Sequence, residues 1–585
     1  MNKRTRAVRA LSGGVCCALL LGSPMARATV PESAIVQAIR LQQKRAALKR
    51  RQALVQQQHQ RLPQRQALPS PLVTGVTGQR CERVRTIRIT GNHVISSSRL
   101  SALARPYGGH CLGLAQINAL LKQITFVYMK RGYVASRAYL PQQDLASGQL
   151  HIVIVEGTLT RITFHEPVRA PHRLAAMIFP GLTGQPVNLR AIEQGLDQLN
   201  RLPSWQARTA LHPGARPGQS RLLILGQPGK AWRLSASADN QGSRSTGHYD
   251  SGLGLVVDNP AGLGDQVSVH YQHSMADSPL AWSKDRHRSD DVMLSYSVPY
   301  GNWLVRMNGS DYWYHSRLQG NLTPIQTSGT SRSWTLGASR MVFRDRVSKT
   351  HLSLSLGWQS SHNDVDGTQV DVTSHALTTL TLGVSHVRRW LGGQLSASLD
   401  DRRGLPWWGA AHDHRTRPQT PKSEFNLVDA QFGFYRPFQL GQQRCSWNAQ
   451  LSGQWSPERL YSSQQLTLGG ANSVRGLSYA LFSGNNGVWL RNTLAWAPQL
   501  AVAPGVARWL GSIEPYLGLD AGQILSQQRL AIDGGHLVGG SLGLRSVGGR
   551  VHLELTWSHI LAYTRVAGQS GLGRGVLYAS LAMTY

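Results

Sequence analysis

After its first 28 residues, the sequence has no continuous apolar run that approaches the roughly 20 residues of a membrane-spanning helix. This absence excludes a helical membrane protein once the amino-terminal segment is removed. Charge is also scarce, because Asp, Glu, Lys and Arg make up only 16% of the 585 residues. A disordered chain would lack the regular strand patterns described below.

Motifs of metal and nucleotide chemistry are missing. The sequence has no H-E-x-x-H, no paired C-x-x-C and no G-x-x-x-x-G-K-[ST] segment. No pair of residues has a spacing that indicates a nucleophile and its base, although such groups assemble in space and sequence alone does not exclude them. We therefore predict no metal, no cofactor and no catalytic residues.

The amino-terminus predicts export. Residues 15–21 form a short apolar core, and Ala26-Arg27-Ala28 has the A-x-A form of a cleavage site. The basic residues before this core are Lys3, Arg4, Arg6 and Arg9. We interpret residues 1–28 as a signal peptide, which places the mature start at Thr29 and Cys16 and Cys17 in the removed segment.

Few cysteines remain after this cleavage. Cys81 and Cys111 belong to one compact segment in an oxidising compartment, which favours a disulfide, with two buried thiols as the alternative. Closing a loop of about 30 residues would stabilise the fold by roughly 3–4 kcal/mol in the chain-entropy model. Cys445 is interpreted as a small residue on a strand.

The predicted mature chain begins with a helical segment, which a linker follows. Residues 29–61 are rich in Gln, Ala, Arg and Leu, and Leu41, Leu48 and Val55 recur every seven residues. This apolar stripe is too narrow for a core helix, so the helix is either exposed or lies in a wet channel. Residues 62–79 contain three prolines and read as an extended linker.

Two small α/β units follow in tandem. Residues 80–157 show a strand at 84–90, a helix over 114–128 closed by Gly132, and strands at 135–140 and 149–156. Residues 158–229 repeat this order. Their strands are expected at 161–164, 206–211 and 221–225, and their helices at 173–178 and 189–199.

The remaining residues, 230–585, alternate apolar and small polar side chains with period two. The clearest examples are residues 266–273, 351–359, 447–455 and 551–557. A soluble sandwich has the same alternation, but a small, mostly uncharged polar face in an exported chain favours a transmembrane β-barrel. With about 20–24 residues per strand and connection, the region accommodates roughly 14–18 strands around a polar lumen.

The carboxy-terminus supports this interpretation. Residues 575–585 alternate strictly and end on Tyr585, with Leu577, Leu581 and Met583 on one side and Tyr578 on the other. A closed barrel needs such a last strand, because it must pair with the first to remove both edges. The pattern resembles the terminal signal of outer-membrane barrels, which implies the barrel-assembly machinery as a partner during biogenesis.

Basic residues outnumber acidic ones by 62 to 30, giving a net charge of +32. Such an excess is typical of nucleic-acid binding. Because the signal peptide directs the chain away from nucleic acid, we expect no such partner. Arginines on loops that face lipopolysaccharide, or that line the lumen, explain the charge within an outer membrane.

The whole chain resembles the TpsB transporters of two-partner secretion, of the ShlB/FhaC/HecB haemolysin-secretion type. The short matches in the tandem units are Cys111-Leu112-Gly113, Arg131-Gly132-Tyr133-Val134, Arg137-Ala138-Tyr139-Leu140-Pro141, Val155-Glu156-Gly157 and Leu199-Asn200-Arg201-Leu202-Pro203. Asp239-Asn240-Gln241-Gly242 matches the opening of the barrel, and Gly469-Gly470-Ala471-Asn472-Ser473-Val474-Arg475-Gly476 resembles the V-R-G-Y/F loop tip. Here Leu477 replaces the aromatic residue of the family, so the aromatic packing of the loop tip is not carried over to this sequence, whereas the role of the arginine is.

The resemblance implies a 16-stranded barrel, two POTRA domains at 80–157 and 158–229, and a plug helix at 29–61 lodged in the lumen. It also implies a loop latch in which Val474, Arg475 and Gly476 reach into the barrel and Arg475 meets Asp520. In a wet lumen such a pair is worth about 1–2 kcal/mol. The alternative is that Arg475 only lines the pore.

The implied function is export of an unfolded exoprotein of the TpsA type, a haemolysin, adhesin or contact-dependent inhibition toxin, without ATP. Arg137, Ala138, Tyr139 and Leu140 are candidate residues for pairing with this substrate by β-augmentation, as is the second unit. POTRA surfaces that only orient the barrel are the alternative. A BamA-type assembly factor is the rival function; an outer-membrane enzyme or a passive porin is less consistent with the sequence.

Overall fold

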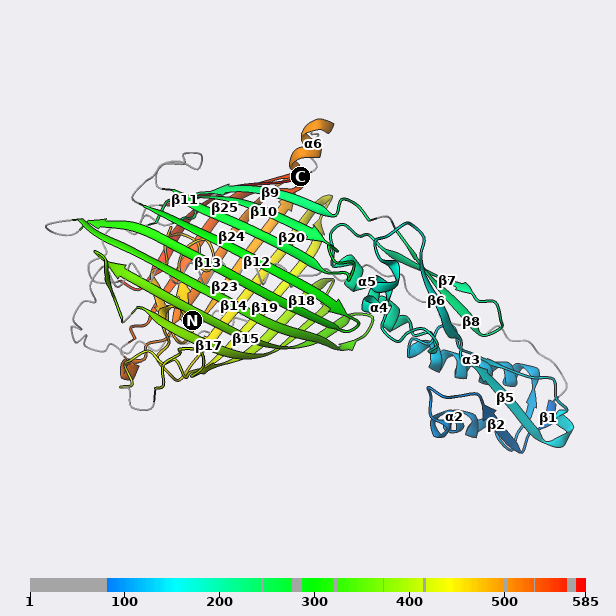
Figure 1. Cartoon of the computed structure of the whole chain (residues 1–585). Helices are drawn as coiled ribbons and strands as arrows, with labels where there is room; N and C mark the ends of the chain where they lie inside the picture. The colour runs from blue at the N-terminus through cyan, green and yellow to red at the C-terminus, as the bar shows by residue number, and fades with distance from the viewer. Residues whose placement is uncertain are drawn as a thin grey trace, which may run out of the picture.

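The computed structural model describes residues 81–585, except 227, 243–245, 276–286, 320–323, 372, 414–416, 499–502, 531 and 566–574. A β-barrel forms one end of the described chain and two small α/β units form the other (Figure 1). The predicted signal peptide (1–28), plug helix (29–61) and linker (62–79) lie outside the described residues. Within these residues, no helix has the length and apolar character needed to cross a membrane.

The first unit packs two helices against a three-stranded sheet of order β2-β5-β4. Its strands are β1 (Cys81–Arg83), β2 (Thr86–Thr90), β3 (Cys111–Gly113), β4 (Arg137–Tyr139) and β5 (Gln149–Val155), and its helices are α2 (Ser97–Ala104) and α3 (Leu114–Lys130). The predicted strand at 84–90 was too long. Val84 and Arg85 leave the ladder because their N–H groups bond His110 and Gly148 carbonyls.

The predicted disulfide is confirmed. Cys81 and Cys111 lie on the antiparallel strands β1 and β3, with their Cα atoms 5.3 Å apart. Buried apolar residues of α3 pack on the alternate residues of β5, forming the core of the unit. Tyr128 belongs to this core, and its hydroxyl donates to Glu156 at 2.7 Å. Burial is the main cause that raises the pKa of Tyr128, and this hydrogen bond raises it further.

The second unit repeats the topology of the first, with the sheet order β6-β8-β7. In both units the first strand in that order runs parallel to the central strand, and the last runs antiparallel to it. The elements are β6 (Thr158–Phe164), α4 (Pro171–Ile178), α5 (Leu189–Asn200), β7 (Arg208–Pro213) and β8 (Gln219–Leu225). The expected tandem repeat is therefore present.

Sixteen antiparallel strands close the barrel, within the predicted range, and the two-residue β16 (Thr368–Gln369) is added to one hairpin. The wall strands are β9 (Trp232–Asp239), β10 (Tyr249–Asp258), β11 (Gln266–Met275), β12 (Arg288–Tyr300), β13 (Trp303–Gln319), β14 (Pro324–Arg344), β15 (Ser348–Val365), β17 (His375–Trp390), β18 (Gly393–Leu405), β19 (Asn426–Leu440), β20 (Gln443–Trp455), β23 (Gly487–Ala497), β24 (Gly511–Ile524), β25 (Gly535–Gly548), β26 (Val551–Tyr563) and β27 (Val576–Thr584).

The terminal strand closes the barrel as predicted. β27 pairs with β26 on one side and with β9 on the other, and Asp239 at the end of β9 lies opposite Ser580. Leu577 is 56% exposed on the outer face, whereas Tyr578 is 5% exposed inside. Cys445 lies on wall strand β20, as expected. Alternation along each strand thus produces an apolar outside and a polar interior.

Helix α5 joins the second unit to the barrel. Glu193 and Asp197 of α5 and its C-cap residue Arg201 are four apart and share one face. Asp197 lies 2.5 Å from both Arg344 and Lys349 of the barrel. Arg201 donates to the Ser297 hydroxyl and to the Gly264 carbonyl. Burial is the main cause that lowers the pKa of Arg201 to about 10, and the positive charge of Arg306 adds to it.

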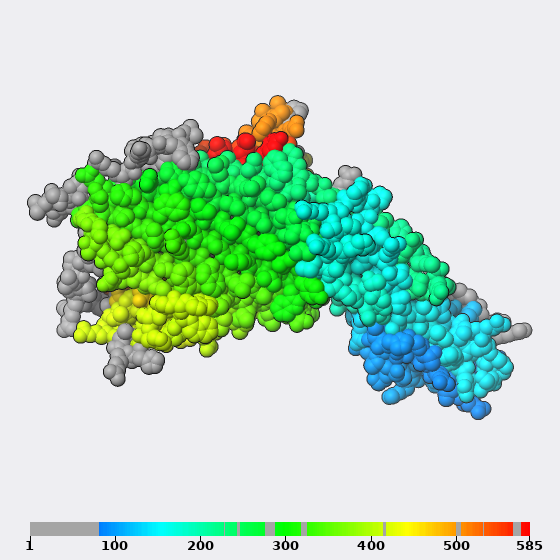
Figure 2. Space-filling model, viewed as in Figure 1, coloured from blue at the N-terminus to red at the C-terminus, as the bar shows by residue number. Residues whose placement is uncertain are grey.

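These contacts fix which end of the barrel faces the two units. The Gly301 N–H, in the turn between β12 and β13, donates to the Met177 carbonyl of the second unit at 2.8 Å. Gln198 of α5 donates back to the Gly301 carbonyl at 3.2 Å. The rim with the β12–β13 turn is therefore the rim on which the tandem units sit (Figure 2).

Candidate functional site

The loop between β20 and β23, residues 456–486, folds back into the barrel. A short hairpin, β21 (Leu466–Leu468) with β22 (Phe482–Gly484), stiffens it. Apolar residues of the loop pack with wall residues in one buried cluster: Leu466, Leu468, Val474, Leu477 and Phe482 from the loop, and Ile524, Leu537 and Ile560 from the wall. This packing holds the loop tip, residues 469–477, against the inside of β24–β27.

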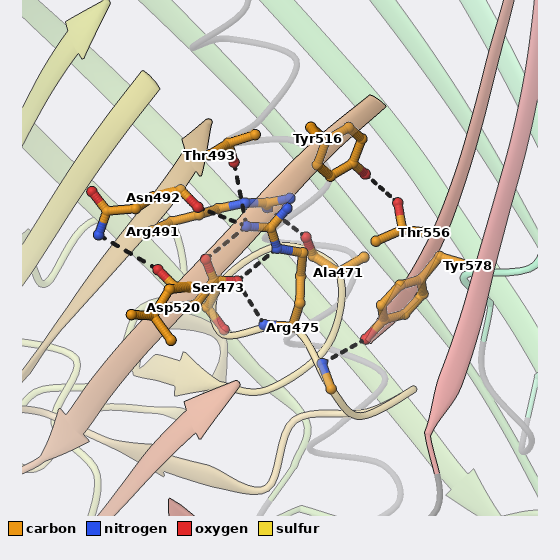
Figure 3. A network of polar contacts seen from close by, with 12 residues as sticks. Ala471, Ser473, Arg475, Arg491, Asn492, Thr493, Tyr516, Asp520, Thr556 and Tyr578 are labelled. Atoms are coloured by element: carbon orange, nitrogen blue, oxygen red, sulfur yellow. Dashed lines mark hydrogen bonds and ion pairs between the residues drawn. The ribbon is translucent and has the colours of Figure 1, made fainter. Parts of the chain in front are cut away.

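At the tip, Arg475 makes a two-pronged contact with Asp520 of β24 (Figure 3). Its Nε donates to Asp520 Oδ2 at 2.6 Å and its Nη2 to Oδ1 at 2.8 Å. The backbone N–H of Arg475 donates to the same carboxylate at 3.1 Å. Arg475 Nη2 also reaches the carbonyl of Asn492 and the hydroxyl of Thr493 on β23. The planar guanidinium thus binds the carboxylate through two parallel N–H groups, a geometry that the ammonium of Lys does not offer.

The pair is buried, which corrects the expectation of a wet environment. The Arg475 side chain is 3% exposed and that of Asp520 is 0% exposed, because the loop cluster and the wall enclose them. Desolvation offsets much of the attraction between two buried charges, but removing one partner typically costs about 3–5 kcal/mol. The contact therefore specifies the position of the tip more than it adds net stability.

Two wall glycines make room for Arg475. A Cβ atom on Gly518 of β24 would overlap the Arg475 guanidinium, and one on Gly539 of β25 would overlap the Arg475 carbonyl oxygen. Gly476 has a φ of +131°, and a Cβ there would lie 3.0 Å from Ile560 Cγ1. The backbone of the tip thus approaches the wall at distances that only glycine permits.

Leu477 occupies the position for which the resemblance led us to expect an aromatic residue. It is 4% exposed and packs within the apolar cluster. Tyr578 of β27 contacts the backbone of the tip at this point. Its hydroxyl donates to the Leu477 carbonyl at 2.5 Å and accepts from the Gly476 N–H at 3.4 Å. An aliphatic side chain therefore fills this site, and a wall tyrosine bonds the backbone on either side of it through its hydroxyl.

Sequence reasoning missed Arg491 on β23. This residue is the cross-strand neighbour of Asp520, and its Nη1 donates to the Ala471 carbonyl in the loop at 2.7 Å. A signal was present, because Arg491 falls on the inward side of a strand whose outward residues include Val488, Leu490 and Leu494. An arginine on the inner face of a lipid-facing strand indicates a lumen contact.

A lumen cavity of about 650 Å³ lies between the loop tip and α5 of the second unit. Serine side chains of the wall, such as Ser353, Ser385 and Ser396, contribute part of its lining. Its basic residues are Arg201, Arg306, Lys349, Arg475 and Arg491, and its acidic residues are Asp197, Asp400 and Glu554. Among the charged side chains that line this cavity, basic residues outnumber acidic ones.

Of the candidate substrate residues, Arg137, Ala138 and Tyr139 form β4, which within the described residues is an edge strand paired with β5, and Leu140 follows it. Tyr139 is 50% exposed. However, the Ala138 N–H donates to the Thr125 hydroxyl of α3 at 3.2 Å, so part of this edge already has a partner. The edge strand β7 of the second unit is longer and has Leu211 40% exposed.

The part of the chain that the structure describes contains no cluster of three or more His, Cys, Asp or Glu residues suited to a metal ion. The polar groups around Arg475 are a guanidinium, a carboxylate, hydroxyls and carbonyls that bond to one another. This arrangement can hold or release a loop.

Comparisons with known proteins agree with this architecture. Residues 218–546 match the family model described as haemolysin secretion/activation protein ShlB/FhaC/HecB. Residues 83–157 match the ShlB-type POTRA domain, and residues 158–213 match a POTRA domain. The first and second α/β units are thus both POTRA domains.

Among curated relatives, the outer membrane transporter CdiB of Escherichia coli is 33% identical over 88% of this chain and 90% of its own length. The haemolysin transporter protein ShlB of Serratia marcescens is 28% identical over 87% of this chain and 89% of its own length. The solved structure of CdiB from Escherichia coli superposes with a TM-score of 0.82, at 30% identity, over 95% of this chain and 100% of that chain. CdiB from Acinetobacter baumannii has the same fold, with a TM-score of 0.75 at 21% identity, over 95% and 100% of the two chains.

Proposed function

The chain belongs to the ShlB/FhaC/HecB family of haemolysin secretion/activation proteins and is an outer-membrane transporter, and we propose that it exports an unfolded TpsA-type exoprotein through its lumen. Relatives named as haemolysin transporters support a haemolysin as the cargo, with an adhesin or a contact-dependent inhibition toxin as the alternatives. The observation that supports export most directly is the Arg475–Asp520 contact inside a barrel whose rim bears two POTRA domains.

In this proposal, Val474, Arg475, Gly476 and Asp520 form a loop latch. With Arg475 paired, the tip stays against β24 and occupies part of the lumen. Because the pair is buried, the Asp520 carboxylate must accept hydrogen bonds from water or from another donor when the tip leaves it. The latch therefore favours two distinct loop positions over a continuum, which suits a channel that opens for a substrate.

A strand edge of the POTRA domains is the proposed recognition surface. An extended segment of the exoprotein adds to a sheet through backbone hydrogen bonds, and side-chain pockets supply selectivity. The edge strand β4, residues Arg137–Tyr139, is available once Ala138 exchanges its bond to Thr125. The six-residue edge strand β7 gives the same mode a longer register.

The helix predicted at residues 29–61 is proposed as a plug that occupies the lumen between rounds of export. Among the acidic lining residues of the cavity, Asp400 and Glu554 are the proposed partners of its Arg and Lys side chains, because Asp197 already pairs with Arg344 and Lys349. Its narrow apolar stripe gives it little apolar surface to bury. A substrate can therefore displace it.

No ATP is required in this scheme. The periplasm has no ATP, and the sequence has no phosphate-binding loop of the Walker type. Folding of the exoprotein outside the cell removes the unfolded form and draws transport outward by mass action.

The test is export in a host that lacks both components. The chain is expressed with the large exoprotein encoded beside it, and the medium and cell surface are assayed for that exoprotein. Export that depends on this chain and fails with Arg475→Ala, but not with Arg346→Ala in an exposed turn, supports the proposal. An inserted barrel that exports nothing contradicts it.

The alternative function is a BamA-type assembly factor, which inserts other barrels. It shares the V-R-G loop, although such factors usually have more POTRA copies. Loss of other outer-membrane barrels on depletion of this chain, with no exoprotein in the medium, would favour this alternative.

A further inference from the structure

Helix α6 (Pro504–Leu510) lies between β23 and β24, at the rim that bears the POTRA domains. In Figure 1 it projects outward from the barrel wall beside the carboxy-terminus, and Figure 2 shows it raised above the outer surface of the barrel. Its neighbours in space are β24, β25 and β26. The helix therefore stands on the lipid side of the wall, outside the lumen.

The helix is amphipathic. Trp509 and Leu510 follow Val506 by three and four positions and share its side, whereas Arg508 lies on the other. Val506 is 46% and Trp509 47% exposed, although both are large apolar residues. Among the described residues, much of this face is open, and Leu510 is also partly exposed.

The same rim has exposed aromatic residues around the barrel. They include Trp232, Tyr300, Trp303, Trp390, Trp447, Trp496 and Tyr585, each at least 40% exposed. Such girdles mark the boundary between the acyl chains and the headgroups. The apolar face of α6 lies at the rim that bears this girdle and extends it outward from the barrel wall.

Cations accompany the aromatic residues at this rim. The guanidinium of Arg550, in the β25–β26 turn, lies 5.9 Å from the centre of the Trp509 ring. The Lys230 ammonium lies 4.1 Å from the centre of the Tyr585 ring and 5.5 Å from that of Trp232. Together with Arg508 on α6, these cations are suited to lipid phosphate groups beside an apolar layer.

We propose that α6 lies in the periplasmic leaflet of the outer membrane, with Val506, Trp509 and Leu510 among the acyl chains and Arg508 among phospholipid headgroups. The helix is then a lateral anchor outside the strands that bear Asp520 and Glu554. It holds one side of the barrel at a fixed depth, because tilting the wall would move Trp509 out of the interface.

Site-directed spin labelling tests the position of α6. The full-length protein, with Cys445→Ser to remove the free thiol, is labelled at Val506→Cys or at Arg508→Cys and reconstituted into phosphatidylethanolamine and phosphatidylglycerol vesicles. Collision rates with oxygen, which concentrates in the membrane, are compared with those of a water-soluble nickel chelate. Arg508→Cys is the matched control, because it lies two residues away on the opposite face of the same helix.

We expect the ratio of oxygen to chelate collisions to be several-fold higher at position 506 than at position 508. Leu510→Cys, on the face of Val506, gives an independent label if a variant at 506 fails to insert, which heat-modifiability on gels detects. Chelate-dominated collisions at 506 and 510, as at 508, would overturn the proposal by placing α6 in water. Shielding of 506 from both reagents would also overturn it, because protein would then cover this face.

Discussion

Arg475 and Asp520 are 45 positions apart in the sequence, yet two guanidinium nitrogens of Arg475 lie 2.6 and 2.8 Å from the two carboxylate oxygens of Asp520. The contact joins the tip of a long loop to a wall strand inside the barrel. Because both groups are buried, the tip has one well-defined position.

The latch predicts a difference between arginine and lysine at position 475. Arg475→Lys retains the charge but loses the planar fork, so export falls strongly while the barrel still inserts. Arg475→Ala leaves the Asp520 carboxylate buried and unpaired, at a cost of about 3–5 kcal/mol to the docked loop, and abolishes export. Secretion per inserted barrel is the measurement. Export by Arg475→Lys at the level of the unaltered protein would show that charge alone suffices.

The wall glycines predict a steric effect of a single methyl group. Gly539→Ala places a Cβ where the Arg475 carbonyl oxygen lies, so the loop tip must move from the wall and export declines. Gly453→Ala on β20 is the matched control, because a Cβ there would have 3.9 Å to its nearest neighbour. Protease sensitivity of residues 469–477 reports the displacement. Equal sensitivity in the two variants would contradict this account of the close approach.

Arg491 is predicted to position the loop through Ala471. Arg491→Gln shortens the side chain and removes the charge, so the bond to the Ala471 carbonyl is lost while the Arg475–Asp520 pair remains. We expect a several-fold loss of export, smaller than that of Arg475→Ala. A matched pair of spin labels, one in the loop and one on β27, would show a broader distance distribution in the variant. An unchanged distribution would assign Arg491 to the pore lining alone.

The proposed plug predicts a change in conductance. Deleting residues 31–61 removes the helix from the lumen, so single-channel conductance in planar bilayers rises. Deleting part of the linker, residues 64–72, is the control, because it leaves the helix sequence intact. Equal conductance of the unaltered and helix-deleted proteins would remove the plug from the mechanism.

The sequence determined the barrel and its two periplasmic domains, because these depend on local periodicity. Alternation with period two is a property of each strand by itself. It assigned Leu577 and Tyr578 to opposite faces without knowledge of which strands pair. Helical spacing likewise identified α3 and α5. The end of the strand at Val84 was misplaced, because distant carbonyls at His110 and Gly148 decide it.

Only the tertiary structure decided the inside of the barrel. The glycines facing Arg475, the role of Arg491 and the burial of the latch depend on the register of β23, β24 and β25 and on a loop that returns from the far rim. The outward projection of α6 likewise depends on the wall behind it. These features arise from contacts between residues far apart in the chain, where side-chain volume and desolvation act and local sequence pattern does not.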